Sequence, residues 1–272
     1  MRLITSSRGQ IEVHEWGAGR SAIVLLHAAA SGPRALSRLA EAMAKHGVRV
    51  LAPALAGYGD TFTAGDADAI GAHVVVARAV LDDVDAERVA LFGHSMGGLV
   101  ALRTALAVRA EVSVIAYEPV AFGALDRTRQ PDATAAGWDR RIAEQLIDAV
   151  ARGEPEAGVA AFVEAWNEVR WAALPEAARR SLVSAASRLA AEVACVSRDA
   201  TPASAYAALG HRLTLLRGTH SPDAVRLIAD RIAAATPGST LVEMADAGHM
   251  APVMQTDAVA DAILSTLRPS AP

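Results

Sequence analysis

A serine flanked by two glycines stands in Gly93-His94-Ser95-Met96-Gly97, which fits the pattern G-x-S-x-G. A strand pattern over residues 88–92 precedes it, and a helix pattern follows it to about residue 108. So sharp a turn from strand to helix strains the serine backbone and leaves no room for side chains two residues to either side. The first N–H of the helix, that of Met96, could stabilise an oxyanion. The pattern predicts Ser95 as a nucleophile; the alternative is an ordinary glycine-rich turn without chemistry.

Such a serine needs a base, because a free hydroxyl is a poor nucleophile at neutral pH. Of the eight histidines, His249 follows the last predicted strand, at the same carboxyl edge of the sheet as Ser95. His94 neighbours the serine but is expected to point away from it. His27 ends an early strand and is expected to order the loop above it, beside the substrate pocket. His220 also lies at this edge and is interpreted as a loop residue.

Repeated strand–helix units must position these residues. A hairpin over 3–5 and 11–16 precedes predicted strands at 22–26, 48–52, 88–92, 112–117, 212–216 and 240–244. Helix patterns cover 34–46, 66–81, 96–108, 222–235 and 256–267, and helices alone are expected from about 119 to 200, at 138–152, 155–170 and 175–194. Apolar runs without alternation are typical of parallel strands buried on both faces. The sequence therefore predicts an α/β fold with a mostly parallel, doubly wound sheet and an inserted helical segment.

Composition excludes several classes of protein. The chain has 272 residues, 52% of them apolar and 21% charged, a net charge of −4 and one cysteine. It can bury a large core, so it is neither disordered nor a disulfide scaffold. We expect no nucleic-acid partner and no membrane span. The N-terminus shows no apolar signal-peptide core, which favours a cytoplasmic protein. The sequence has no phosphate-binding glycine loop after the first strand and no metal-ligand spacing, so we expect no cofactor and no metal. The oligomeric state stays open.

On these features the sequence resembles the α/β-hydrolase superfamily, in particular the small bacterial capped serine hydrolases. The resemblance covers nearly the whole chain and rests on four segments, namely His27 with the loop after it, Gly57-Tyr58-Gly59-Asp60, Gly93 to Gly98, and Gly248-His249. It implies that the helical insertion is a cap. The expected division is a first core part at 1–119, the cap at 120–204 and a second core part at 205–272.

The resemblance also implies the chain order serine, acid, histidine and a second oxyanion donor, the backbone N–H of Ala29. Two departures stand out. Ala28 follows His27 where the family usually has glycine, and Ser221 occupies the last position of the usual Gly-x-x-Asp. Serine cannot supply the negative charge that stabilises a histidinium.

Another acid must therefore take that role. Glu118 ends the strand after the nucleophile strand, where some members of the family place the acid; alternatively it is a solvated charge. Asp223 is the rival, but Ser221-Pro222-Asp223 also fits a helix start with an N-cap serine, an N1 proline and a first-turn acid. A further acid, or none, stays open.

The insertion holds three of the four tryptophans, and Trp166 and Asn167 are candidates for lining a substrate pocket. The alternative is that the tryptophans only pack helices together. The reaction expected is hydrolysis of a small or medium carboxylic ester through an acyl-serine, with a small-molecule substrate as the partner. Alternatives on the same residues are thioester, lactone or carbon–carbon bond hydrolysis, or perhydrolysis. A non-catalytic ligand-binding or receptor protein that kept the fold is an alternative of another class.

Overall fold

One eight-stranded sheet runs through the chain in the order β1-β2-β4-β3-β5-β6-β7-β8. It is seen in a computed structural model that describes residues 1–63, 65, 68–108, 112–167 and 169–267. The strands are β1 (Arg2–Ser6), β2 (Gly9–Trp16), β3 (Ser21–Leu26), β4 (Arg49–Pro53), β5 (Arg88–His94), β6 (Ser113–Tyr117), β7 (Leu213–Gly218) and β8 (Thr240–Met244). β2 pairs antiparallel with β1 and β4, and the other pairs are parallel. This is the mostly parallel sheet that the sequence predicts.

The apolar runs explain why the sheet is covered on both faces. In β3, Ile23 and Leu25 belong to one buried cluster, whereas Val24 and Leu26 belong to the other. Successive side chains of a strand point to opposite faces, so a strand in the middle of this fold needs apolar residues at every position. The sheet can therefore bury apolar surface against helices on both sides.

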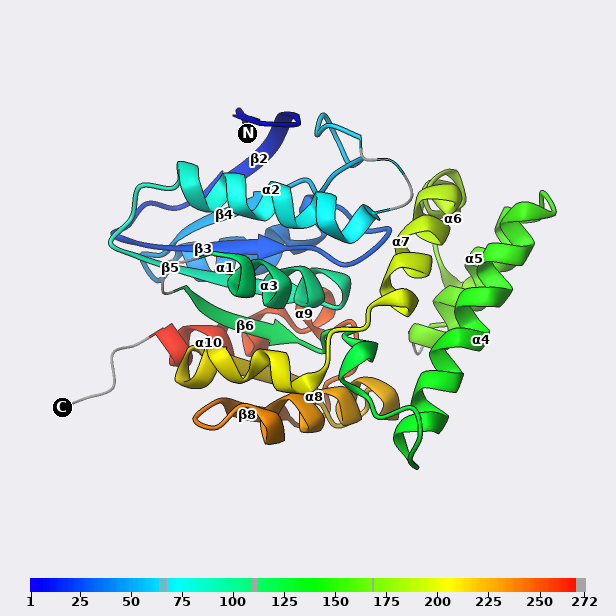
Figure 1. The fold of residues 1–272 in the computed structure, drawn as a ribbon. Coiled ribbons are helices and arrows are strands. Elements are labelled where there is room, and N and C mark those ends of the chain that lie inside the picture. Colours follow the sequence, from blue (N-terminus) through cyan, green and yellow to red (C-terminus); the bar gives the residue numbers. More distant parts are fainter. Residues whose placement is uncertain (64, 66–67, 109–111, 168, 268–272) are drawn as a thin grey trace.

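Helices cover both faces (Figure 1). They are α1 (Ser37–Ala44), α2 (Ala69–Asp83), α3 (Met96–Ala107), α4 (Asp132–Ala151), α5 (Pro155–Trp166), α6 (Glu176–Ser184), α7 (Ala186–Arg198), α8 (Asp223–Ala235), α9 (Ala251–Met254) and α10 (Thr256–Leu267), with 3₁₀ helices at Pro33–Leu36, Phe122–Ala124, Trp171–Ala173 and Ala203–Arg212. α2, α3 and α8 pack on one face, and α1, α9 and α10 on the other. In the described part of the chain, no helix combines the length and apolar character needed to cross a membrane.

The segment between β6 and β7 contains helices and no strand among its described residues. Figure 1 shows α4 to α7 stacked together beyond the ends toward which β3 and β6 point. They share a small apolar core of their own, which includes Leu146, Val159 and Leu189. The insertion therefore stands over the carboxyl edge of the sheet, where Ser95 is located. Its division from the core at 120 and 204 stays a prediction.

Several predicted helix limits differ from the structure. The helix predicted over 175–194 is two helices, because Ala185 between α6 and α7 leaves the helical conformation with ψ near 2°. The helix predicted over 155–170 ends at Trp166, since Asn167 is extended; residue 168 lies outside the described residues. α4 begins six residues before the predicted 138. α2 begins at Ala69 behind Asp68, whose side chain accepts the N–H of Gly71, and residues 66–67 of its predicted start are not described.

Candidate active site

Ser95 lies at the turn between β5 and α3. Its backbone has φ 56° and ψ −116°, which residues with a side chain rarely adopt. A Cβ atom on Gly93 would lie 2.1 Å from the carbonyl oxygen of Gly97, and one on Gly97 would lie 2.1 Å from that of Leu26. The close approach of β3, β5 and α3 therefore requires both glycines, and it presents the serine at the carboxyl edge of the sheet.

His249 and Glu118 form a buried pair. The Nδ1 atom of His249 lies 2.7 Å from Oε2 of Glu118, and neither side chain is appreciably exposed. The other carboxylate oxygen, Oε1, accepts the backbone N–H of Gly218 at 2.7 Å and the hydroxyl of Ser221. Because Nδ1–H is donated to the carboxylate, Nε2 is the ring nitrogen left to accept a proton. The structure thus brings together the predicted base and the first of its candidate acids.

Two buried side chains hold the backbone beside His249. The Nε2–H of His94 donates to the carbonyl oxygen of His249 at 2.8 Å, and the hydroxyl of Tyr117 donates to that of Gly248 at 2.8 Å. Burial lowers the pKa of His94 to about 3, so this ring is a neutral donor. His94 is the neighbour of Ser95, so this hydrogen bond joins the segment of His249 to the turn between β5 and α3. Among the described residues no hydrogen bond joins Ser95 Oγ to His249.

Asp223, the rival acid, lies elsewhere. It is the first residue of α8, its side chain is fully exposed, and it faces Arg226 at 3.6 Å. An acid in the first turn stabilises a helix through its dipole, which accounts for this residue without catalysis. His220 is an exposed loop residue 3.9 Å from Asp246, as the sequence suggests.

The loop after β3 contains the second oxyanion candidate, Ala29. Its strained residue is Ala30, with φ 58°, so Ala28 does not need the conformational freedom of glycine. The N–H of Ala30 is bound by Tyr58. The N–H groups of Ala29 and Met96 donate to no other described residue. Both N–H groups are therefore without a partner among the described residues at this edge of the sheet, in keeping with the sequence prediction.

His27 binds the backbone of this loop. It does not line the cleft described next, although the sequence predicts it beside the substrate pocket. It is fully buried. Its Nε2 accepts the N–H of Leu55 at 3.2 Å, and its Nδ1–H donates to the carbonyl of Ala28 at 2.8 Å. Burial lowers its pKa to about 3, so the ring stays neutral. A neutral ring that uses both nitrogens internally orders backbone rather than contacting a substrate.

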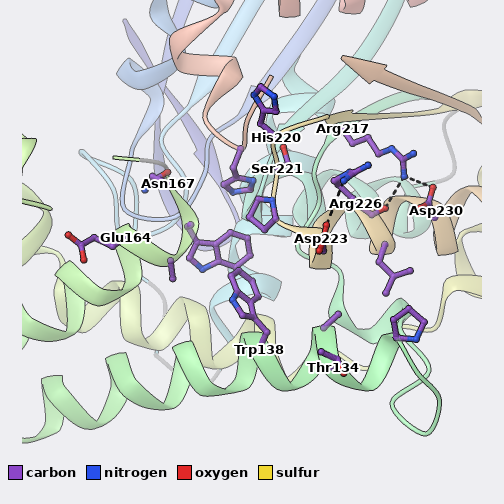
Figure 2. Close-up of a pocket in the computed structure, with 17 residues that line it drawn as sticks. Thr134, Trp138, Glu164, Asn167, Arg217, His220, Ser221, Asp223, Arg226 and Asp230 are labelled. Carbon is purple, nitrogen blue, oxygen red and sulfur yellow. Dashed lines mark hydrogen bonds and ion pairs between the residues drawn. The ribbon is translucent and has the colours of Figure 1, made fainter. Parts of the chain in front are cut away.

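A cleft of about 880 Å³ lies between the insertion and the β7–α8 segment, against His249. Figure 2 shows Trp138 and Asn167 on the side of the insertion and Arg217, Arg226 and Asp230 opposite. The lining comprises Pro131, Thr134, Ala135, Trp138, Glu164, Ala165, Trp166, Asn167, Arg217, His220, Ser221, Pro222, Asp223, Arg226, Leu227, Asp230 and His249. Of the three predicted pocket residues, Trp166 and Asn167 are therefore part of it, and His27 is not.

The ring of Trp166 lines the cleft next to the ring of His249. Its ring centroid lies 4.9 Å from that of His249 and 4.9 Å from that of Trp138. It is also largely buried, so it both lines the cleft and packs helices, and the two interpretations from the sequence are not exclusive. Asn167 donates its amide to the carbonyl of Val163 at 3.0 Å, and its Oδ1 is buried without a partner among the described residues.

A model of the alpha/beta hydrolase family matches residues 23–262. The chain belongs to this family. Solved structures of the fold include an alpha/beta hydrolase from Sphaerobacter thermophilus, with a TM-score of 0.74 and 22% identity over 98% of this chain and 100% of that one. An esterase from Exiguobacterium antarcticum has a TM-score of 0.71 and 17% identity over 98% and 99%. At such identities the likeness shows the fold alone.

A curated relative is the 2-hydroxy-6-oxononadienedioate/2-hydroxy-6-oxononatrienedioate hydrolase of Cupriavidus pinatubonensis, 36% identical over 106 residues. The match spans 36% of this chain and 35% of that relative, or about a third of its length. The family match, which spans most of the chain, identifies the protein as a hydrolase.

Three residues that anchor the site are not predicted from the sequence. For His94 the sequence indicates only that the ring points away from Ser95, and Tyr117 and Tyr58 are not among its candidates. The one available signal was indirect, since a tyrosine that ends a buried strand beside a polar edge needs a partner for its hydroxyl.

Proposed function

We propose that this alpha/beta hydrolase cleaves small or medium carboxylic esters through an acyl-serine intermediate. The observation that carries the proposal is the buried hydrogen bond of 2.7 Å between His249 Nδ1 and Glu118 Oε2, close to the strained Ser95. A carboxylate held on Nδ1 keeps Nε2 free and stabilises the ring when it becomes a cation. That arrangement is the one that a serine nucleophile requires of its base.

In this mechanism Ser95 Oγ attacks the ester carbonyl carbon and its proton passes to His249 Nε2. The tetrahedral oxyanion accepts the N–H groups of Met96 and Ala29. When the bond to the alcohol oxygen breaks, the proton moves from His249 to the leaving alcohol. Water then attacks the acyl-serine, with His249 as base, and releases the acid and the serine hydroxyl. Glu118 holds Nδ1 of His249 and stabilises the ring in its cationic form.

The charges of the cleft favour substrates without a second carboxylate. Arg217 pairs with Asp230 and Glu243, and Arg226 faces Asp223 and Glu243. The positive charge of both guanidinium groups is therefore balanced by neighbouring acids, although Arg226 lies beyond hydrogen-bond distance of both acids that it faces. This balance of charge favours neutral esters over substrates that carry a second carboxylate. Thioester, lactone and carbon–carbon bond hydrolysis remain open to the same residues.

The test is turnover of p-nitrophenyl acetate and butyrate by the wild type, by Ser95→Ala and by His249→Ala. We expect hydrolysis by the wild type only, with thermal unfolding of Ser95→Ala close to that of the wild type, since its hydroxyl makes no packing contact that the fold requires. A wild type that binds such esters without hydrolysing them would favour the ligand-binding alternative and overturn the proposal.

A further inference from the structure

A buried polar cluster joins helix α7 of the insertion to the loop that carries the oxyanion candidate. Tyr58, in the loop after β4, accepts the N–H of Ala30 at 2.8 Å and donates its hydroxyl to Oε2 of Glu192 at 2.8 Å. Tyr58 is 5% exposed and Glu192 is 1% exposed. One hydroxyl thus links a glutamate of the insertion to the backbone beside Ala29.

Helix α7 also holds the ring and the loop around Tyr58. The guanidinium carbon of Arg188 lies 3.9 Å from the centroid of the Tyr58 ring, and its Nη1–H donates to the carbonyl of Gly57 at 2.8 Å. On the far side, Nε2 of His73 lies 3.4 Å from Oε1 of Glu192. Two residues of one helix therefore fix the tyrosine by its face and by its hydroxyl.

The contact is made where the backbone is strained. Ala30 has φ 58°, and such a conformation persists in a residue with a side chain only when its surroundings determine it. The hydroxyl that binds its N–H is kept protonated, because burial, and next the charge of Glu192, raise the pKa of Tyr58. The hydroxyl can therefore donate to Glu192 and accept from Ala30 at once.

We propose that Tyr58 is a positioning residue for the oxyanion loop, and that Glu192 and Arg188 of α7 hold it in place. The contacts of the insertion with the core then set the direction of the Ala29 N–H. The same packing that encloses the substrate therefore also orients a donor to the oxyanion. The inference rests on the proposed acyl-serine mechanism, in which that N–H stabilises the oxyanion.

The experiment measures the rate at which a fluorophosphonate phosphonylates Ser95, because the product presents a phosphoryl oxygen to the same N–H groups. Tyr58→Phe deletes only the hydroxyl, and Glu192→Gln keeps an acceptor for it. Tyr206→Phe is the matched control, because it removes a buried tyrosine hydroxyl from the 3₁₀ helix before β7, outside the loop of Ala29. Asp139→Asn, at a buried acid of α4 that binds Ser197, controls for a weakened insertion.

We expect Tyr58→Phe to slow labelling about tenfold and Glu192→Gln to slow it about threefold, because a displaced donor loses part of its effect on an oxyanion. For p-nitrophenyl butyrate, kcat should fall by similar factors with KM little changed. Both controls should label at the wild-type rate. Should Tyr58→Phe not fold, Glu192→Gln against Asp139→Asn gives the same comparison.

A double variant separates positioning from stability. Tyr58→Phe combined with Glu192→Met removes the buried carboxylate together with its donor, so Tm should recover while labelling stays slow. If labelling recovers with Tm, the cluster is only structural and the inference is wrong. Labelling of Tyr58→Phe at the wild-type rate also overturns it and leaves the proposed function standing. A wild type that is not labelled at all overturns the proposed function, and this inference with it.

Discussion

Ser221 donates its hydroxyl to Oε1 of Glu118, the carboxylate whose other oxygen binds His249. The residue at the usual acid position thus serves as a donor to the acid at the end of the neighbouring strand. Together with the N–H of Gly218, it supplies the hydrogen bonds that hold a buried carboxylate in one orientation. Ser221 therefore supports the acid without supplying the charge itself.

Glu118→Gln should lower kcat for esters by about 10³- to 10⁴-fold, as neutralising the acid of a serine triad does. The amide keeps the shape but cannot stabilise a histidinium, and it can present its NH₂ to Nδ1. Asp223→Asn is the control and should change kcat by less than about twofold, because that side chain is exposed. Steady-state kinetics measure both.

Restoring an acid at position 221 gives a second test of the same idea. In the Glu118→Gln background, Ser221→Asp should recover activity by about tenfold or more, because a charge returns beside the side chain that contacts the His249 ring. Full activity of Glu118→Gln alone would show that Glu118 does not supply the charge.

Trp166→Ala should move the preferred acyl chain of p-nitrophenyl esters to greater length. The ring closes the cleft beside His249, and each methylene that fits gains about 0.8 kcal/mol until the wall is met. We therefore expect kcat/KM of the wild type to rise over the first methylenes and then fall, and the maximum to shift in the variant. Trp171→Ala removes an insertion tryptophan outside the cleft lining and is the control. A maximum that stays in place while activity falls would make Trp166 a packing residue only.

Acid should destabilise the fold through His27 and His94. Burial lowers the pKa of each to about 3, whereas in the unfolded chain each binds a proton below about pH 6.5. Between these values the unfolded chain holds more protons than the folded one. The stability that depends on these two neutral rings should be complete above about pH 6.5. Below that pH the free energy of unfolding should fall by about 1.4 kcal/mol per pH unit for each histidine.

Urea unfolding at several values between about pH 7 and 5, above the range where most carboxylates titrate, measures that slope. His94→Gln keeps an N–H donor for the carbonyl of His249 and should reduce the slope by one proton. If wild type and variant show the same slope, His94 is not a source of the acid sensitivity.

Gly97→Ala should prevent the nucleophile turn from forming, because its Cβ would lie 2.1 Å from the carbonyl oxygen of Leu26. We expect loss of activity together with a large fall in Tm, or no folded protein. Gly137→Ala is the matched change in α4, where the nearest atom is a flexible arginine nitrogen at 3.7 Å. It should stabilise the protein by about 0.5–1 kcal/mol. Thermal unfolding followed by circular dichroism compares the two, and a stable, active Gly97→Ala would refute this account of the turn.

The sheet and the turn at Ser95 can be predicted because both depend on residues that are neighbours in the sequence. Strands buried on both faces need continuous apolar runs, and a tight strand–helix turn needs glycines. Glu118 could be proposed because carboxyl ends of parallel strands meet at one edge. The anchors could not be predicted, since Tyr117 and Gly248 lie 131 residues apart and Tyr58 and Glu192 lie 134 apart. Such bonds depend on how distant segments pack, which no periodicity records, and the helix break at Ala185 has no glycine or proline to mark it.

The nucleophile can be identified by mapping where a fluorophosphonate becomes attached. Trypsin releases the peptide Val89–Arg103, in which Ser95 is the one serine and no threonine or tyrosine is present. Mass spectrometry should find a single added phosphonyl group on that peptide in the wild type, none in Ser95→Ala, and much slower addition in Glu118→Gln. Attachment at another residue, or no attachment to the folded wild type, would contradict the assignment of Ser95 as the nucleophile.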